Sequence, residues 1–146
     1  MAIDRQGTGL FVLRLFIGTF FVFQGLAKLH WFTDSSILAR QLAAWHQNVA
    51  SNSISAQYLE RVAIPYTAVF ARLVPIGEMS CGLAMVVGLW TPLFAFVAFV
   101  MALNFHIAGG TLFQYGFLSS GYGLPVLGAT LALALGGVRL PLSVRK

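Results

Sequence analysis

The sequence predicts an all-α integral membrane protein: a four-helix bundle with a short interfacial helical segment between the first and second spans. Two observations support this fold class. Hydrophobic residues make up 58% of the 146 positions and charged residues only 9%, whereas a soluble domain usually carries about 25% charged residues. No Asp, Glu, Lys or Arg occurs from Met79 to Val138, a stretch long enough for nearly three spans of about 20 residues each. Lipid rather than water must therefore surround most of the chain.

The hydropathy pattern places the spans in a single domain that covers residues 1–146. The first span is rich in Phe, and Lys28 and Trp31 at its end form the cation-plus-aromatic signature of a membrane interface. Trp90-Thr91-Pro92 is a tight connection that starts the third span, since Pro fits the first turn of a helix. The expected spans cover approximately residues 9–29, 67–90, 92–108 and 122–138.

The polar region between the first two spans predicts short helices over residues 34–64. Asp34, Ser35 and Ser36 supply a helix N-cap signal. The apolar residues that follow lie on one helical stripe, namely Leu38, Leu42, Trp45 and Val49. We expect this helix to lie in the membrane interface, and a second short helix over residues 54–64 to stop at Pro65.

The charge distribution indicates orientation and excludes some partners. Four spans put both termini on one side, where basic residues lie in short flanks directly beside spans. We therefore expect the termini in the cytoplasm, although the basic residues of the two sides are nearly equal in number. The formal net charge is +5, but no basic cluster with interleaved aromatics suggests nucleic acid.

Small residues recur at every fourth position on two spans. They are Ser80, Ala84 and Gly88 on the second span, and Gly128, Ala132 and Gly136 on the fourth. Such rows permit close approach of helix backbones in lipid. We expect packing within one bundle, and the alternative is a specific oligomer interface.

Six polar residues within or beside the spans are candidate site residues. Charged groups at the centre of a span cost about 2.5–3.5 kcal/mol each on insertion scales, so each needs a structural or functional reason. At a rise of about 1.5 Å per residue, several of these residues fall at comparable depth in the half of the bundle near the polar segment. The candidates are Arg14, Gln24, Lys28, Glu78, Asn104 and His106.

The six candidates support two interpretations. They could line one polar cavity for a polar headgroup such as a quinone, with Glu78 and His106 as proton acceptors or hydrogen-bond partners. Alternatively, Glu78 forms a buried ion pair with Arg14 or Lys28 that fixes the helix arrangement, and His106 is a hydrogen-bonded structural residue. No zinc spacing, phosphate loop or nucleophile motif is present, and the single cysteine, Cys81, reads as a small core residue.

Three segments resemble the DoxX family, and within it the DoxD-like small subunit of thiosulfate:quinone oxidoreductase. The first runs from Leu13-Arg14-Leu15 to Gln24-Gly25-Leu26-Ala27-Lys28. The second is Arg72-Leu73-Val74-Pro75-Ile76-Gly77-Glu78, followed by Gly82, Gly88 and Thr91-Pro92. The third is Asn104-Phe105-His106-Ile107-Ala108-Gly109-Gly110. The resemblance implies a four-helix protein of a bacterial or archaeal inner membrane, often associated with redox enzymes and sometimes with quinone reduction.

Two functions follow from these observations. The first is a DoxX-like membrane subunit of an electron-transfer complex that contributes to a quinone site. The alternative is a non-catalytic accessory subunit of a larger respiratory or photosynthetic membrane complex, holding lipid or pigment. Both imply membrane lipids as surroundings, and other membrane subunits or further copies of this chain as partners.

Overall fold

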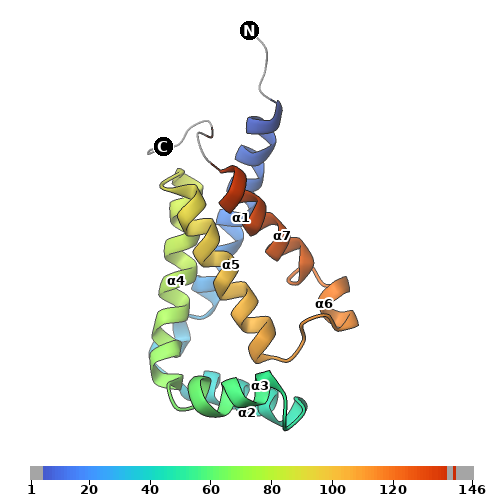
Figure 1. Cartoon of the computed structure of the whole chain (residues 1–146). Coiled ribbons are helices and arrows are strands. Elements are labelled where there is room, and N and C mark those ends of the chain that lie inside the picture. Colours follow the sequence, from blue (N-terminus) through green and yellow to red (C-terminus); the bar gives the residue numbers. More distant parts are fainter. Residues whose placement is uncertain (1–4, 138–139, 141–146) are drawn as a thin grey trace.

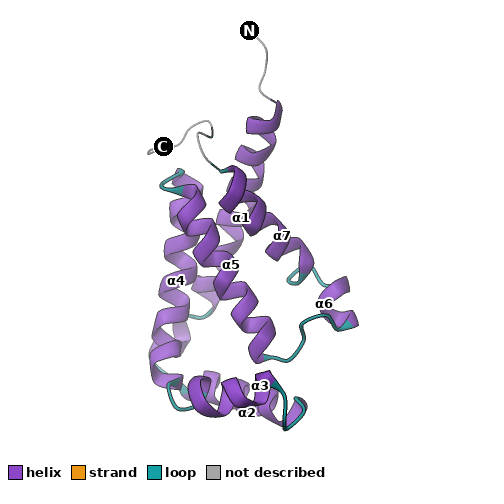
Figure 2. Cartoon of the chain, in the orientation of Figure 1, coloured by secondary structure: helices purple, strands orange, loops and turns teal. Residues whose placement is uncertain are grey.

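The computed structural model describes residues 5–137 and residue 140, and within that part of the chain every regular element is a helix (Figures 1 and 2). Three helices are long and apolar enough to cross a membrane: α1 (Arg5–Ala27), α4 (Thr67–Val87) and α5 (Thr91–Ala108). These helices confirm the predicted all-α membrane fold. Helices suit lipid because each one satisfies its own backbone polar groups internally.

The last long apolar segment is shorter than the predicted span over residues 122–138. Helix α7 (Leu124–Gly136) has 13 residues, a length of about 20 Å at about 1.5 Å per residue, against a hydrocarbon core of about 30 Å. Gly123 precedes its first turn and Gly137 follows its last, while residue 138 lies outside the described residues. A further short helix, α6 (Tyr115–Ser119), was not predicted and stands between α5 and α7 (Figure 1).

Helices α1 and α4 pack closely because two glycines face each other where they cross. A Cβ atom added at Gly82 would lie 2.5 Å from the backbone nitrogen of Val22, and one added at Gly18 would lie 2.9 Å from the carbonyl oxygen of Gly82. No side chain fits between these backbones, so glycine permits the approach. The contact uses a different set of small residues from the rows noticed in the sequence.

The row of small residues on α7 is exposed, although a Cβ atom added at Gly136 would lie 3.1 Å from the Leu10 side chain of α1. Gly128, Ala132 and Gly136 are all exposed, and nothing lies within 4 Å of a Cβ atom added at Gly128. The expected packing of this row within the bundle is therefore seen at Gly136 but not at Gly128. On α4, by contrast, Ala84 and Gly88 are buried, whereas Ser80 is exposed.

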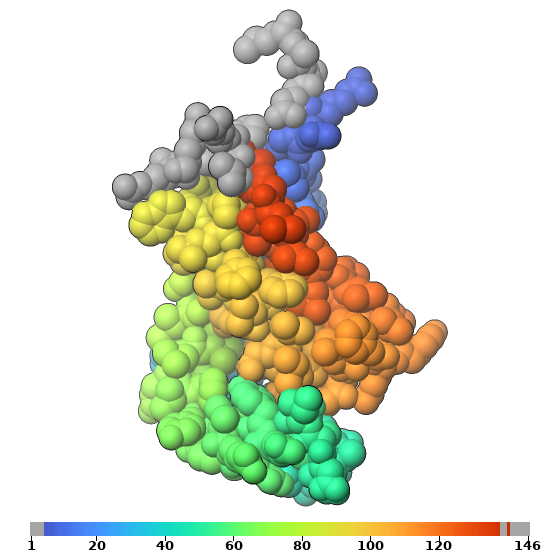
Figure 3. Space-filling model, viewed as in Figure 1, coloured from blue at the N-terminus to red at the C-terminus, as the bar shows by residue number. Residues whose placement is uncertain are grey.

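The segment between α1 and α4 forms a cap over one end of the bundle (Figures 1 and 3). It contains η1 (Leu29–Phe32), α2 (Ser36–Asn48), α3 (Ile54–Tyr58) and η2 (Leu59–Ala63), a π-helical turn. Of the predicted N-cap signal, Ser35 is the N-cap of α2 without a side-chain cap bond, and the Asp34 carboxylate accepts a hydrogen bond from the Ser36 N–H at 2.9 Å. The cap of α3 was not predicted: the Ser53 hydroxyl accepts a hydrogen bond from the Ala56 N–H at 3.1 Å.

Helix α2 buries its apolar stripe against protein. Leu38 and Leu42 are 2% and 4% exposed and pack in one cluster with Ala63, Ala71 and Ala108. The outward face of α2 is polar or small, and includes the exposed Arg40. The apolar stripe therefore contacts the ends of the long helices.

Two hydrophobic clusters make up the core, one toward each end of the bundle. The cluster beneath the cap includes Trp31 and Leu59, and the cluster nearer the first residue of α1 includes Phe21, Cys81 and Met85. Cys81 is 2% exposed, as expected for a small core residue. The cavity described next is lined from both clusters, so it lies where they meet.

Candidate functional site

A cavity of about 350 Å³ lies at the junction of the cap and the long helices, and we call it the polar cavity. Aromatic and polar side chains contribute equally to its walls, and the polar ones come from α1 and the residue that follows it, from α2, α4 and α5, and from the loop before α6. The aromatic residues are Phe20, Phe21, Trp31, Trp45, Phe105 and Tyr122; the polar residues are Gln24, Lys28, Gln41, Glu78, His106 and Thr111; Ala102, Gly109 and Val126 complete the lining.

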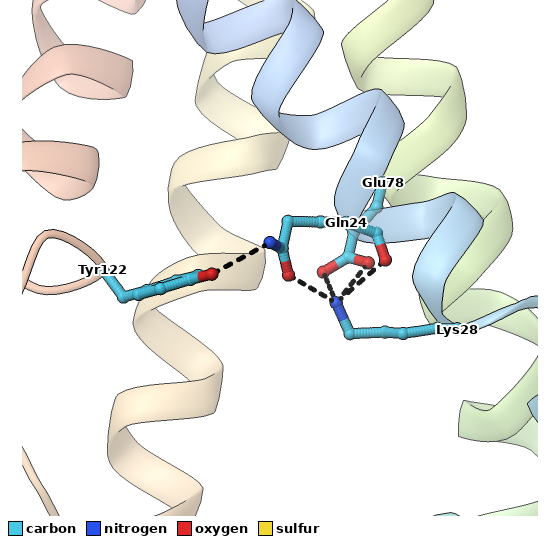
Figure 4. Close-up of polar contacts among 4 residues, drawn as sticks. All are labelled: Gln24, Lys28, Glu78 and Tyr122. Carbon is cyan, nitrogen blue, oxygen red and sulfur yellow. Dashed lines mark hydrogen bonds and ion pairs between the residues drawn. The ribbon is translucent and has the colours of Figure 1, made fainter.

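An ion pair between Lys28 and Glu78 joins α1 to α4 at this cavity (Figure 4). Lys28 follows the last residue of α1, and its ammonium nitrogen lies 2.8 and 2.7 Å from the two carboxylate oxygens of Glu78. The side chains are 17% and 5% exposed, respectively. Of the two partners considered for Glu78, the structure therefore selects Lys28.

The Lys28 ammonium is also bound by groups other than Glu78. It donates to the side-chain oxygen and to the backbone carbonyl of Gln24, both at 3.3 Å. Its nitrogen lies 5.7 Å from the centre of the Phe105 ring and 6.0 Å from that of Trp31, within the range of cation–π attraction. Four acceptor atoms of Gln24 and Glu78 therefore surround the three ammonium hydrogens.

Gln24 connects this ion pair to the far side of the cavity. Its Nε2 donates to the hydroxyl oxygen of Tyr122 at 3.3 Å (Figure 4), while its Oε1 accepts from Lys28. The Phe20 ring, one turn earlier on α1, lies 5.5 Å from the Tyr122 ring at an interplanar angle of 58°. Tyr122 lies just before the start of α7, so these contacts join α1 to α7.

His106 has a hydrogen-bond partner for each ring nitrogen. Nε2 lies 2.9 Å from the Tyr122 carbonyl oxygen, and Nδ1 lies 3.1 Å from the Thr111 hydroxyl. Because a carbonyl oxygen can only accept, Nε2 carries a hydrogen, and in the neutral ring Nδ1 accepts from Thr111. The ring also meets Phe117 edge-on at 4.8 Å. His106 thus holds the α6 region against α5, as expected for a hydrogen-bonded structural residue.

Two of the six candidate residues lie outside the polar cavity. Asn104 precedes His106 by two positions, a rotation of about 200° on a helix, and it lines a separate small cavity of about 20 Å³ with Leu38 and Tyr58. Arg14 is 1% exposed, and its guanidinium carbon lies 5.1 Å from the centre of the Phe11 ring. It precedes Gln24 by about 15 Å along α1, too far to share the cavity.

Sequence reasoning missed several residues of the cavity wall. The sequence pattern predicted Trp31 to be an interfacial aromatic residue. It placed Trp45 only in the apolar stripe of α2, without indicating which part of the chain that stripe contacts. Gln41, Thr111 and Tyr122 carried no distinguishing pattern. Tyr122 lies between Gly121 and Gly123, and only the return of α7 toward α1 brings it to Gln24.

Among the described residues, no group of three or more His, Cys, Asp or Glu side chains could hold a metal ion. The arrangement instead combines one buried ion pair, a row of hydrogen-bonded side chains and aromatic walls. This combination suits a ligand with a polar headgroup and an apolar body, because specificity in such cavities comes from a few polar groups on an apolar lining.

Comparison with known proteins supports the family suggested by the motifs. No curated protein and no solved structure matches this chain. The sequence model described as DoxX matches residues 9–109, which is more than half of the chain. This range contains Gln24, Lys28, Glu78 and His106, and it ends before Tyr122. The chain therefore belongs to the DoxX family of membrane proteins.

Proposed function

We propose that the polar cavity binds the headgroup of a quinone and that the chain is the membrane subunit of an electron-transfer complex. The observation that carries the proposal is the Lys28–Glu78 ion pair set in an aromatic-walled cavity of about 350 Å³. This volume falls within the range of about 300–1,000 Å³ typical of small-molecule sites. Aromatic walls suit a flat ring, and the long apolar helices give a lipid-soluble ligand access from the bilayer.

The chemistry assigned to this chain is binding and proton handling. Reduction of a quinone adds two electrons and two protons, and converts both ring carbonyls to hydroxyls. The electrons come from a redox centre of a partner subunit in this proposal. Glu78 is the carboxylate that accepts and passes on protons, and Lys28 holds it in place. Any oxidation of thiosulfate belongs to the partner, because the single cysteine is buried in the core.

The decisive experiment replaces Glu78 by Gln in the purified complex. Glu78→Gln keeps the shape of the side chain but removes its charge and its ability to take a proton, so quinone reduction should be abolished. Glu60→Gln is the matched control, because Glu60 is 54% exposed and lies in the cap. Unchanged turnover in a folded Glu78→Gln complex would remove this function.

A second function, a non-catalytic accessory subunit, is favoured by the outward face of α7. The exposed Gly128 and Ala132 leave one face of this short helix open to a neighbouring helix. Purification in mild detergent would then yield a larger complex with this chain at fixed stoichiometry, together with lipid or pigment. Isolation as an active free monomer would count against this second function.

We further propose that the protein resides in a bacterial or archaeal inner membrane, with the first residue of α1 toward the cytoplasm. The cap and the polar cavity would then face the outer side. Labelling with a membrane-impermeant maleimide tests this orientation, because Cys81 is only 2% exposed and gives little background. A cysteine at the exposed Ser51 should react in intact cells, and protection there would reverse the assignment.

A further inference from the structure

Tyr122 has an unused hydrogen-bond donor at the rim of the polar cavity. The residue is 59% exposed yet lines the cavity. Its hydroxyl oxygen accepts a hydrogen bond from Gln24, and within the described residues no acceptor receives its hydroxyl hydrogen. A phenol that accepts one hydrogen bond can still donate another.

Three contacts fix the position of this phenol. His106 Nε2 donates to the Tyr122 carbonyl oxygen at 2.9 Å, Phe20 contacts the ring at 5.5 Å, and Gln24 reaches the hydroxyl at 3.3 Å. The contacts come from α5 and α1, whereas Tyr122 itself precedes α7. A side chain held by two other helices loses little additional freedom when it binds a ligand, which favours affinity.

The same contacts polarise the hydroxyl. Lys28, paired with Glu78, donates to Gln24 Oε1, and Gln24 Nε2 donates to Tyr122. In such a chain each bond strengthens the next, by roughly 10–30% per bond. The Lys28 ammonium itself is already hydrogen-bonded to Glu78 and Gln24.

We propose that the Tyr122 hydroxyl donates a hydrogen bond to a ring carbonyl oxygen of the bound ligand. This assignment rests on the proposed quinone function and makes Tyr122 a headgroup-binding residue. It lies beyond the residues 9–109 that match the DoxX family, so this contact is contributed by the part of the chain outside the family match. Gln24 and His106 are positioning residues for it.

The test compares two ligands of the same shape, menadione and 2-methylnaphthalene, of which only menadione carries ring carbonyls. Binding to the full chain is measured by isothermal titration calorimetry in one detergent. A neutral hydrogen bond contributes about 0.5–1.5 kcal/mol, so Tyr122→Phe should weaken menadione binding by roughly 2- to 12-fold. Binding of 2-methylnaphthalene should not change, because the ring packing against Phe20 remains.

Two further variants complete the design. Tyr115→Phe removes the hydroxyl of a tyrosine that is 84% exposed and does not line the cavity, and should bind menadione as the wild type does. Gln24→Leu removes the polarising donor but leaves the phenol hydrogen, so its loss of menadione affinity should be smaller than that of Tyr122→Phe.

The outcomes separate this inference from the function on which it rests. Menadione binding that is equal in wild type and Tyr122→Phe would overturn the role of Tyr122 alone. Equal weakening of both ligands would also overturn it, since the ring rather than the hydroxyl would then matter. A wild-type chain that fails to bind menadione would overturn the quinone proposal together with the inference.

Discussion

Lys28 and Glu78 approach to 2.7 Å across the α1–α4 interface, and both carboxylate oxygens are bonded by the one ammonium group. The two residues are separated by 50 positions in the chain: Lys28 follows the last residue of α1, and Glu78 lies within α4. In lipid, each charge makes the other tolerable, because an isolated ion would lose its solvation without compensation. The pair therefore holds α1 against α4 and also places both charged side chains in the wall of the polar cavity.

Breaking this pair on one side should be more damaging than removing both charges. Lys28→Met leaves the 5%-exposed Glu78 carboxylate without its counter-ion, at a cost of about 3 kcal/mol, the lower end of the range for buried pairs because Lys28 borders a cavity. The double variant Lys28→Met/Glu78→Gln should recover most of that loss. Thermal unfolding of the four variants of this cycle in one detergent measures the difference; additive losses would contradict the pairing.

The glycine contact between α1 and α4 predicts a position-specific response to one added methyl group. Gly18→Ala and Gly82→Ala should each lower the unfolding free energy by about 1–3 kcal/mol, the usual cost of overpacking. Gly9→Ala is the matched control on α1, since nothing lies within 4 Å of a Cβ atom there. A lower melting temperature for all three variants alike would argue against close contact at the crossing.

Filling the polar cavity without altering its polar groups should block the ligand. Ala102 lines the cavity from α5, so Ala102→Leu should weaken menadione binding while leaving the Lys28–Glu78 pair in place. The control is Ala68→Leu, which adds the same atoms at an exposed position of α4. Titration calorimetry distinguishes the two variants, and equal affinities would mean that menadione binds elsewhere.

The cap should loosen under acid conditions through Asp34. Hydrogen bonds from the Ser36 side chain and backbone hold the pKa of the Asp34 carboxyl below its usual value. Because the folded-state pKa is depressed, this contribution is present above the unfolded pKa of about 3.9 and is lost as the pH falls through the folded-state value. The Asp34→Asn variant should keep the hydrogen bond from the Ser36 N–H at neutral pH, because the asparagine side-chain oxygen also accepts.

Fluorescence of Trp31 and Trp45 measures this loosening, since both lie at the contact between the cap and the cavity. In wild type their emission should shift toward that of exposed tryptophan below about pH 4, whereas Asp34→Asn should show a smaller acid-dependent change. Trp90→Phe in both backgrounds removes the third tryptophan, which lies in the α4–α5 connection. Identical acid titrations of the wild type and Asp34→Asn would show that the cap does not depend on this carboxylate.

Much of the fold could be predicted from the sequence, because a chain in lipid must satisfy its backbone polar groups within each helix. The long uncharged stretch from Met79 to Val138 required membrane helices. Pro92 near the start of α5 marked a tight connection, which the structure contains, although α4 ends at Val87, before the predicted Trp90. The Asp34-Ser35-Ser36 signal marked the start of α2, which begins at Ser36. These signals act over a few neighbouring residues, so they are visible without tertiary contacts.

The site could be anticipated only in part. Depth along each helix grouped Gln24, Lys28, Glu78 and His106, which all line the polar cavity, because the rise per residue is fixed. Depth alone said nothing about rotation, so it also brought Asn104 into this group, although that side chain lines a different cavity.

What the sequence by itself determined is the surrounding medium, the helical class and the presence of a few ionisable groups that needed partners. Only the tertiary structure decided which partners they found. In the folded chain Glu78 pairs with Lys28, and the apolar stripe of α2 packs on the helix ends. Tyr122 contacts Gln24, which lies 98 positions earlier in the chain. Such choices depend on how helices cross and rotate against one another, and those geometries are set by packing between segments distant in the chain.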